Sequence, residues 1–462
     1  MATLRDDARG IWRAAIRAVA PDRLIGSRLR VADGQLLVDE QPCDPPAAVA
    51  GNGRIVAVGG GKAAAGVAAG LEQLIPNGLP LEGLIGVPEG CGLALPRIEV
   101  REVRPQGRNE PTDACVRATR EMLAMLGDLT ADDLAIAVVT GGGSAILTAP
   151  LPGIPLEEVV ATTRWLSERG ADIGQLNCVR QAVSRVKAGG LARSCRAGRL
   201  VVLVISDVIG NPLATISSGP CMPCEVRHSE VLAILDRFGA VAANVAPAIV
   251  AHLSKAATDV PSQRPEAAAV ASGRWHTPAG CVVSHHLLAS NATAVNAAAA
   301  VASQLGYEVR LRHADPSVSE TADAVGRRLA AEGVAAIQQT SGTRIAIVEG
   351  GEATVCLPEN HGLGGRNQQT VAAALAWNEQ HHGWPSRLLI ASVGTDGEDG
   401  PTAAAGAVAD EAVANCITNR GVALGEAVRR CNAYPLLDAG GGLIHTGSTG
   451  TNVADIRIVL VH

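Results

Sequence analysis

The chain of 462 residues is nearly devoid of aromatic side chains, which make up 2% of it, with a single phenylalanine. Its hydrophobic content is nevertheless 47%, so its cores must be built from alanine, valine, leucine and isoleucine. It also lacks an apolar run of the roughly 18 residues that a membrane helix needs, and its N-terminal stretch is charged throughout, which predicts neither a membrane span nor a signal peptide. With a net charge of -6 and no basic block, nucleic acid is not expected as a partner.

Disulfide pairing is not indicated either. The eleven cysteines are an odd number and lie scattered along the chain, which favours a reducing cytoplasm. The alanine-rich, lysine-poor composition suggests a bacterial source. The one tight pair, Cys221 and Cys224, has only His228 nearby, whereas a zinc site needs two further ligands at suitable spacing. We therefore expect these two thiols to be ordinary buried or loop residues.

What the sequence does contain is a repeated alternation of apolar runs and alanine-rich helical stretches. The runs are continuous and β-branched, which is typical of strands buried on both faces. They lie at 54–60, 83–87, 133–143, 199–207, 343–351, 386–394 and 455–461. Helices are predicted between them, for example at 113–126, 228–239 and 322–333. The pattern predicts an α/β protein with mostly parallel or mixed sheets flanked by helices. A polar segment at 258–280 predicts two domains, 1–275 and 276–462.

The first glycine-rich turn is VAVGGGKAAAG at 56–66, where a strand leads into a helix that Lys62 precedes. Backbone N–H groups at such a helix start attract anions, so Gly60, Gly61 and Lys62 are candidate phosphate ligands. A G-x-G-x-x-A pattern is also present, which is a weak signal for a dinucleotide fold because the expected acid after the second strand is missing. A tight turn with a solvated lysine is the alternative.

The second turn is VVTGGGSAI at 138–146. Its three glycines, Gly141, Gly142 and Gly143, would let a phosphate approach the backbone closely, with Ser144 beside it. A nucleophilic role for Ser144 would require a nearby histidine and the G-x-S-x-G spacing, and the sequence has neither. A phosphate-binding loop is therefore the preferred interpretation.

The segment at 200–220 contains two further polar turns. Ser206 and Asp207 follow a strand, where Asp207 would serve as a magnesium ligand, as a general base or simply as a turn cap. Asn211, Ser218 and Gly219 are binding candidates in the same segment. Upstream of them, at 170–192, a helix would place Arg180 and Ser184 on one face, with Lys187 one turn later. Together with Asn177, the two cations could hold an anion, or they could form a solvated basic face.

Two candidate segments lie in the second half of the chain. At 359–376, Gly364 and Gly365 precede Arg366 and Asn367 at a predicted helix start, where Arg366 could bind a carboxylate or phosphate bidentately or form a structural ion pair.

The other is SVGTDGEDGPTAAAGA at 392–407, which places three acids in a glycine turn directly after a strand. Asp396, next to Thr395, is the predicted site residue and a second magnesium candidate. Asp399 is predicted to cap a following alanine-rich helix, and Glu398 to face water.

These segments, in this order, resemble the glycerate 2-kinase family, which has an N-terminal kinase domain and a C-terminal MOFRL domain, and of which some members are labelled hydroxypyruvate reductase. The resemblance is carried by GKAAAG, TGGGSAIL, GADIGQLNCVRQAVSRVKAGGLA, ISDVIGNPLATISSGP, EGGEATV, GLGGRNQQ, GTDGEDGPTAAAGA and TGSTGTNVADI, between residues 61 and 456. It implies transfer of the ATP γ-phosphoryl group to the 2-hydroxyl of D-glycerate, with magnesium, in a cleft between the domains. The family's essential lysine and arginine match Lys62 and Arg366.

The chain departs from the family pattern at several positions. A Gly-His-Pro-x-Pro-Asp-Glu segment is GRNEPTDA here (107–114), a Pro is replaced by Ser448, and an Asp by Asn432. The additional Arg108 suggests a larger or more anionic sugar acid as substrate. An NAD(P)H-dependent hydroxypyruvate reductase and a non-catalytic sugar-acid-binding protein are the alternatives. The sequence leaves open the exact acid, which glycine loop holds ATP, and the oligomeric state, a homodimer included.

Overall fold

The computed structural model describes residues 3–48, 53–106, 109–256, 273–339, 342–381 and 383–462. The chain forms two compact units. The N-terminal unit comprises Leu24–Ile205 and Asn211–Leu288, and the C-terminal unit comprises Met1–Arg23, Ser206–Gly210 and Ala289–His462. This division differs from the single boundary predicted at residue 275, which falls within strand β9 (Arg274–His276).

The N-terminal unit is built on a seven-stranded sheet with the strand order β6-β5-β4-β7-β8-β10-β9. Its other strands are β4 (Ile55–Gly60), β5 (Leu81–Pro88), β6 (Ile98–Arg104), β7 (Leu134–Thr140), β8 (Arg199–Ile205) and β10 (Val282–Ala289). Strands β6, β5, β4, β7 and β8 are parallel to their neighbours, as the continuous apolar runs predict. A separate antiparallel sheet contains β1 (Leu29–Ala32), β2 (Gln35–Val38) and β3 (Gln41–Ala48).

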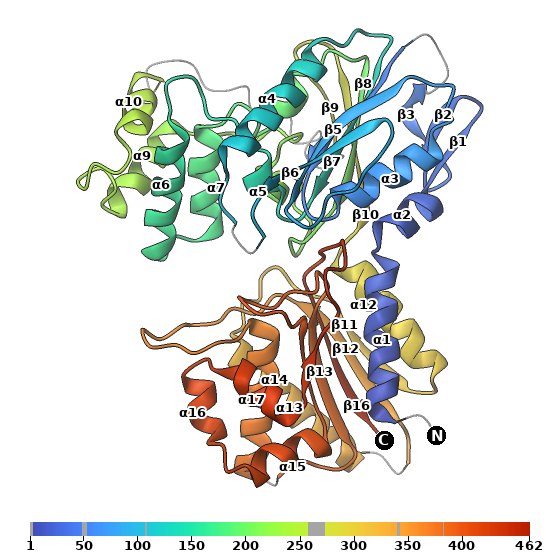
Figure 1. Cartoon of the computed structure of the whole chain (residues 1–462), viewed down its shortest axis with the longest axis vertical. Helices are drawn as coiled ribbons and strands as arrows, with labels where there is room; N and C mark the ends of the chain where they lie inside the picture. Colours follow the sequence, from blue (N-terminus) through green and yellow to red (C-terminus); the bar gives the residue numbers. More distant parts are fainter. Residues whose placement is uncertain (1–2, 49–52, 107–108, 257–272, 340–341, 382) are drawn as a thin grey trace. The chain divides into compact units, whose positions relative to one another are not determined.

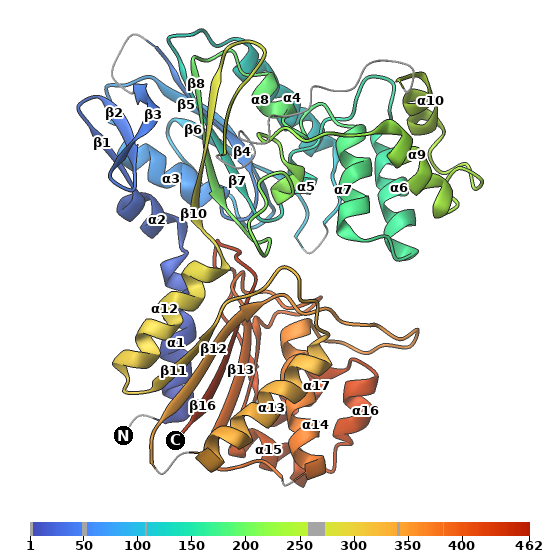
Figure 2. The same ribbon diagram turned by 180° about the vertical axis from the view of Figure 1, so that it is seen from behind.

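The helices of this unit fall into two groups. Those near the sheet are α3 (Ala64–Leu74), α4 (Asp113–Gly127), α5 (Gly143–Ile146) and α8 (Gly190–Arg193), with the short helix η1 (Ile216–Ser218); α2 (Pro21–Arg28) precedes the small sheet. The others gather beside the sheet (Figures 1 and 2): α6 (Leu156–Glu168), α7 (Ile173–Ala182), α9 (His228–Arg237) and α10 (Pro247–Ala256). They share their own apolar core, which includes Leu166, Val179 and Leu235.

The C-terminal unit contains a six-stranded mixed sheet with the order β11-β12-β16-β13-β14-β15. The strands are β11 (Glu308–Arg312), β12 (Ile345–Gly351), β13 (Leu388–Gly394), β14 (Gly406–Ala409), β15 (Leu443–Ile444) and β16 (Asp455–Val461). The last strand, β16, is inserted antiparallel between β12 and β13 and is buried along its whole length. The sheet thereby pairs the C-terminal segment with two strands that lie much earlier in the chain, as in the pairs Asp455 with Gly394 and Val461 with Ile345.

Helices cover both faces of this sheet (Figures 1 and 2). On one face lie α1 (Leu4–Ala18) and α12 (Asn291–Gln304), and on the other α13 (Ala322–Gln339) and α14 (Arg366–His381). The remaining helices are α15 (Glu411–Asn419), α16 (Leu424–Arg429) and α17 (Ala433–Gly440). The alanine-rich helix predicted after Asp399 is wrong, because residues 401–405 form an irregular, non-helical segment that leads directly into β14.

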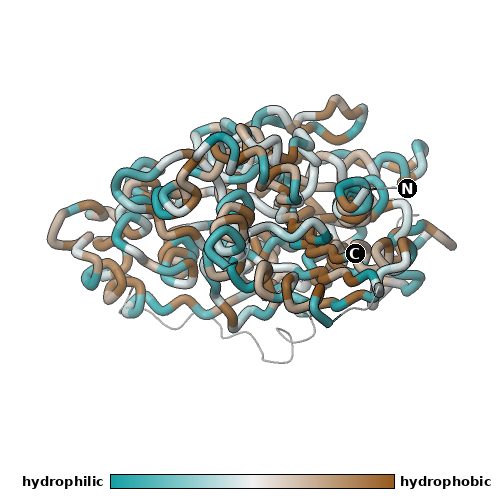
Figure 3. Tube along the Cα trace, turned by 90° about the horizontal axis from the view of Figure 1, so that it is seen from below, coloured by the Kyte–Doolittle hydropathy of each residue, from teal (hydrophilic) through white to brown (hydrophobic). Residues whose placement is uncertain are grey.

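Hydrophobic positions are distributed along the chain in short stretches. Figure 3 shows them interspersed with hydrophilic positions throughout the trace. Among the described residues, no helix is long and apolar enough to cross a membrane.

The first helix is fastened to the C-terminal unit by a buried carboxylate. Asp7 of α1 is 5% exposed, accepts a hydrogen bond of 2.8 Å from the Tyr307 hydroxyl and forms an ion pair with Arg344. The sequence gives no local sign of this contact, because its partners lie about 300 residues away.

We expect Asp7→Ala to lower the stability of the C-terminal unit by about 1–2 kcal/mol, because it leaves a half-buried guanidinium without its carboxylate. Urea unfolding followed by circular dichroism measures the change. Arg17→Ala, at an exposed position of the same helix, is the control. Equal midpoints for the two variants would contradict a role of Asp7 in holding α1.

Candidate active site

The loops after β4 and β7 lie at the point where the strand order of the N-terminal sheet reverses. The chain runs from β4 outward to β5 and β6 on one side, and from β7 to β8 on the other. Open α/β sheets bind ligands at the carboxyl ends of strands at such a switch point. Lys62 directly follows β4 at this switch point, and its backbone N–H donates to the Gly141 carbonyl at 2.9 Å. The first two predicted loops are in direct contact.

One glycine of the first loop is required by this contact. Gly61 has φ of +132°, and an added Cβ would lie 2.1 Å from the Thr140 hydroxyl oxygen. Gly60 is the last residue of β4, Gly142 adopts a left-handed conformation, and Gly143 opens the single turn α5. Close packing between the two loops is thus one reason for the glycine-rich sequence, apart from any phosphate.

A chain of side-chain hydrogen bonds brings four of the predicted residues together. The hydroxyl oxygens of Ser144 and Ser218 are 2.8 Å apart, and Ser218 donates to Asn177 Oδ1 at 3.0 Å. Lys187 Nζ donates to the Ser144 carbonyl at 2.6 Å, the Ser144 hydroxyl at 3.2 Å and the Leu147 carbonyl at 3.3 Å. Ser218 and Gly219 both adopt positive φ angles in the turn around η1.

The predicted helical face at 180–187 is wrong in its second half. Helix α7 ends at Ala182, so Ser184 and Lys187 lie in the loop that follows. Lys187 is only 4% exposed, and burial, followed by the charge of Arg180, lowers its pKa to about 7. Its hydrogen bonds to Ser144 and Leu147 therefore hold the second glycine loop in place. Arg180, by contrast, lines a pocket that Ser144 and Lys187 also border.

The turn after β8 is divided between the two units. Ser206 and Asp207 belong to the C-terminal unit, whereas Asn211, which has a positive φ, begins the next segment of the N-terminal unit. Ser206 is buried, and its hydroxyl accepts from the Val208 N–H and donates to the Val208 carbonyl.

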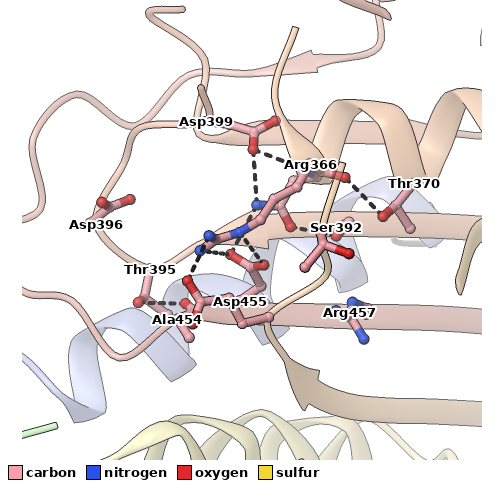
Figure 4. Close-up of polar contacts among 12 residues, drawn as sticks. Arg366, Thr370, Ser392, Thr395, Asp396, Asp399, Ala454, Asp455 and Arg457 are labelled. Carbon is pink, nitrogen blue, oxygen red and sulfur yellow. Dashed lines mark hydrogen bonds and ion pairs between the residues drawn. The ribbon is translucent and has the colours of Figure 1, made fainter. Parts of the chain in front are cut away.

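In the C-terminal unit, Arg366 begins α14 and is held by two acids (Figure 4). Its Nε and Nη2 bind Asp455 Oδ2 and Oδ1 at 2.7 and 3.0 Å, and its Nη1 binds Glu352 at 2.7 Å. These carboxylates raise the pKa of Arg366 against the effect of burial, and burial raises that of Glu352. Arg366 thus has the ion pairs of a structural arginine while its side chain remains one-third exposed at a pocket.

Sequence reasoning did not single out Asp455 or Glu352. Asp455 lies within the TGSTGTNVADI segment, as the first residue of the buried strand β16. An acid at the start of a strand that is otherwise apolar except for Arg457 needs a partner when it is buried, and this was the available signal in the sequence.

Asp399 caps helix α14, which comes before it in the sequence, and not the residues that follow it. Its carboxylate accepts the backbone N–H groups of Asn367 (3.0 Å) and Gln368 (2.8 Å) in the first turn of α14, which precedes it by more than 30 residues. It is 2% exposed, and burial raises its pKa to about 6. Gly365 permits this approach, because a Cβ there would lie 2.3 Å from the Asp399 carboxyl carbon.

Asn367 and Thr395 are also occupied by structural contacts. Asn367 is 1% exposed, donates to Asp399 and Asp455 and accepts from the Ser392 hydroxyl. The Thr395 hydroxyl joins the backbone at Val453 and Ala454. Both were predicted as binding residues, and the structure places both beneath the loop, where their contacts fix its shape.

We expect Asp399→Asn to destabilise the C-terminal unit by about 2 kcal/mol. The asparagine amide nitrogen would face one of the two N–H donors of α14, so one buried hydrogen bond would be lost. Thermal unfolding measures this change. An unchanged midpoint would show that the cap contributes little.

Asp396 stands apart from this network (Figure 4). It is half-buried, and its Oδ1 accepts the Glu398 N–H at 3.0 Å. With Arg366, Glu398 and Gly364 it lines a pocket of about 440 Å³. Glu398, predicted to face water, is half-buried at this pocket.

The acids around Arg366 differ in what they offer to a cation. Asp399 and Asp455 are almost fully buried and each accept several N–H donors, whereas Asp396 is half-buried, accepts the Glu398 N–H and lines the pocket. Among the described residues, no three potential metal ligands lie close enough together to form a group, and this also holds for the neighbourhood of Cys221 and Cys224. Because magnesium is commonly bound by one or two carboxylates together with substrate phosphates, Asp396 fits such an ion as a single ligand.

Comparison with known proteins identifies matching protein families and relatives of this chain. Residues 7–254 match the model of DUF4147, a domain of unknown function, and residues 345–455 match the MOFRL family. Human glycerate kinase is 31% identical over 99% of this chain and 93% of its own length. Glycerate 2-kinase from Pyrococcus horikoshii is 29% identical over 97% of this chain and 95% of its own length.

Solved structures agree with the sequence relatives. The crystal structure of a glycerate kinase from Thermotoga maritima superposes with a TM-score of 0.78 and 27% identity, covering 99% of both chains. A structure from Pyrococcus horikoshii gives the same TM-score over 100% of this chain and 99% of the other. The resemblance inferred from the motifs is confirmed. The chain belongs to the glycerate kinase family.

Proposed function

We propose that the protein is an ATP-dependent kinase that phosphorylates the 2-hydroxyl of D-glycerate, or of a closely related sugar acid, to give ADP and the 2-phosphate. The observation that supports this most is the family relationship over nearly the full length of the chain. Lys62 at the switch point of the N-terminal sheet agrees with it, because phosphoryl transfer depends on positioned positive charge more than on covalent catalysis.

The residues have distinct roles in this proposal. Lys62 contacts the transferred phosphoryl oxygens, while Gly141, Gly142 and Gly143 present the loop beside them. The acceptor hydroxyl attacks the γ-phosphorus, the bond to the bridging oxygen of ADP breaks, and the hydroxyl proton passes to a carboxylate, for which Asp396 is the candidate.

The remaining predicted residues support this chemistry. Arg366, positioned by Asp455, offers its remaining N–H groups to the acid substrate, and Asp207 is a second candidate for orienting the hydroxyl or holding magnesium. When bound, magnesium would neutralise phosphate charge, with Asp396 as a ligand. The cleft between the domains, a cytoplasmic location and a homodimer remain predictions.

The choice of acid is tied to the GRNEPTDA segment. Gly107 and Arg108 lie outside the described residues, so the proposal of a longer or more anionic sugar acid rests on the sequence alone. A substrate screen against sugar acids tests it, with Arg108→His as the matched variant. Equal efficiency on D-glycerate before and after this substitution would remove the argument.

The reaction itself is tested with purified protein, D-glycerate, ATP and magnesium. ADP and 2-phosphoglycerate are the expected products. A parallel incubation with hydroxypyruvate and NADH is expected to leave NADH unconsumed. NADH loss without ADP formation would favour the reductase, and neither change, after the sugar-acid screen, would favour a binding protein.

A further inference from the structure

A pocket of about 240 Å³ lies in the N-terminal unit between helices α5, α6 and α7. Its charged and polar lining includes Ser144, Arg180 and Lys187, which border the second glycine loop, together with Glu168 and the ion pair of Arg164 with Glu110. Three valines line it as well: Val159 and Val160 of α6 and Val183 after α7. The pocket is therefore amphipathic, with Arg180 and Lys187 on its wall beside the glycine loop.

Arg180 is the informative residue of the polar lining. Within the described ranges, no hydrogen bond or ion pair of its guanidinium is found, although it is half-buried. Burial lowers its pKa, which means that the surroundings disfavour its charge. The neighbouring Arg164 differs, because Glu110 binds it bidentately. A desolvated cation without a counter-ion at a pocket wall is suited to an anionic ligand group.

The apolar lining distinguishes between the two substrates of the proposed kinase. Each of the three carbons of D-glycerate carries oxygen, so this acid has little apolar surface to place against Val159, Val160 and Val183. A nucleobase has two flat apolar faces and polar edges, and the hydroxyls of Thr163 and Ser167 border the same space. An anion with an apolar body fits this pocket better than a small hydroxy acid does.

The pocket of the C-terminal unit has the opposite charge. Asp396, Glu398 and Asp399 line it, and its one arginine, Arg366, is already paired with Asp455 and Glu352. Such a site attracts a cation and repels a bare polyphosphate. The two pockets therefore differ in the ligand chemistry that each accepts.

We propose that the N-terminal pocket binds the nucleotide, with the base between α6 and α7 and the phosphates directed toward Arg180 and the loop at Ser144. This inference rests on the proposed kinase function and assigns ATP to the second glycine loop.

The test uses two substitutions in the full-length protein. Arg180→Gln removes the cation, and Val160→Trp places a bulky side chain at a half-buried position of the apolar lining. Arg227→Gln is the control, because Arg227 is an exposed residue of the same unit that is paired with Glu225. Isothermal titration with ADP, without any acid, gives Kd for each variant, steady-state assays give KM for ATP and for D-glycerate, and thermal unfolding confirms that each variant folds.

We expect Arg180→Gln to raise the Kd for ADP about 10- to 100-fold, the loss expected for a charge-assisted contact. Val160→Trp should raise the Kd for ADP and the KM for ATP and leave the KM for D-glycerate unchanged. A change confined to the KM for D-glycerate would overturn the assignment in favour of the acid. Failure of the wild-type protein to bind ADP, or unchanged Kd in both variants, would also overturn it.

These outcomes separate this inference from the proposed function. If ADP binds the wild-type protein and is lost in the variants, but no acid is phosphorylated, the pocket assignment stands and the kinase proposal fails. If D-glycerate is phosphorylated and ADP binding is unchanged in both variants, the kinase proposal stands and the pocket assignment fails.

Discussion

Asp396→Asn is expected to lower kcat about 100-fold or more while leaving the thermal midpoint near that of the wild-type protein. Asparagine keeps the Oδ1 atom that accepts the Glu398 N–H, so the turn after β13 retains its local hydrogen bond. What is lost is the negative charge that faces the pocket, and with it the capacity to take a proton or bind magnesium. Steady-state kinetics with D-glycerate and ATP, paired with thermal unfolding, measure both effects.

Asp399→Asn is the matched comparison, since both acids belong to the same turn. It is expected to lower stability and to leave kcat of the folded protein within a few-fold of wild type, because Asp399 is occupied by α14. The reverse pattern, with turnover lost at Asp399 and stability lost at Asp396, would contradict the division of roles that the structure indicates.

Much of the fold could be predicted from the sequence, because the strands are buried on both faces. Runs such as 54–60 and 455–461 are uninterrupted and β-branched, and the structure confirms each as a strand. The hydrophobic pattern could not reveal whether a strand runs parallel or antiparallel to its neighbours. Strand β16 is as fully buried as β4, yet it is antiparallel to its neighbours because its position is set by pairing with distant strands.

The errors concern contacts between residues that are remote in sequence. Asp399 was predicted to cap the residues after it, since N-caps are recognised locally, but its partners are in α14. Likewise, α1 belongs to the C-terminal unit, where its Asp7 contacts Tyr307 and Arg344. A single domain boundary in the sequence could not describe this, because α1 comes from the opposite end of the chain. Helix α7 ends at Ala182, earlier than its sequence pattern predicts, and Lys187 therefore lies in the following loop and not on the helix.

Lys187 lies beside the second glycine loop, and its protonation is coupled to the hydrogen-bonded serines Ser144 and Ser218. Ser218 donates its hydroxyl hydrogen to Asn177, so Ser144 must donate to Ser218 and accept from Lys187. Lys187 then donates three hydrogen bonds, which requires its protonated form. Because burial and Arg180 lower its pKa to about 7, deprotonation above neutral pH removes one of these bonds and releases the Ser144 hydroxyl to reorient.

The same pKa predicts a pH-dependent stability that Lys187→Met removes. Between about pH 7 and the ordinary value of 10.5, the unfolded chain holds one more proton at this residue than the folded chain does. The free energy of unfolding of the wild-type protein should therefore rise with pH relative to the variant, by up to about 1.4 kcal/mol per pH unit, and the difference should level off below pH 7. Urea unfolding from pH 6 to 9.5 measures it, with Lys255→Met, at an exposed position of α10, as the control. A difference between wild type and Lys187→Met that does not vary with pH would mean that the three acceptors keep Lys187 charged, and Ser144 would then have one fixed orientation across this range.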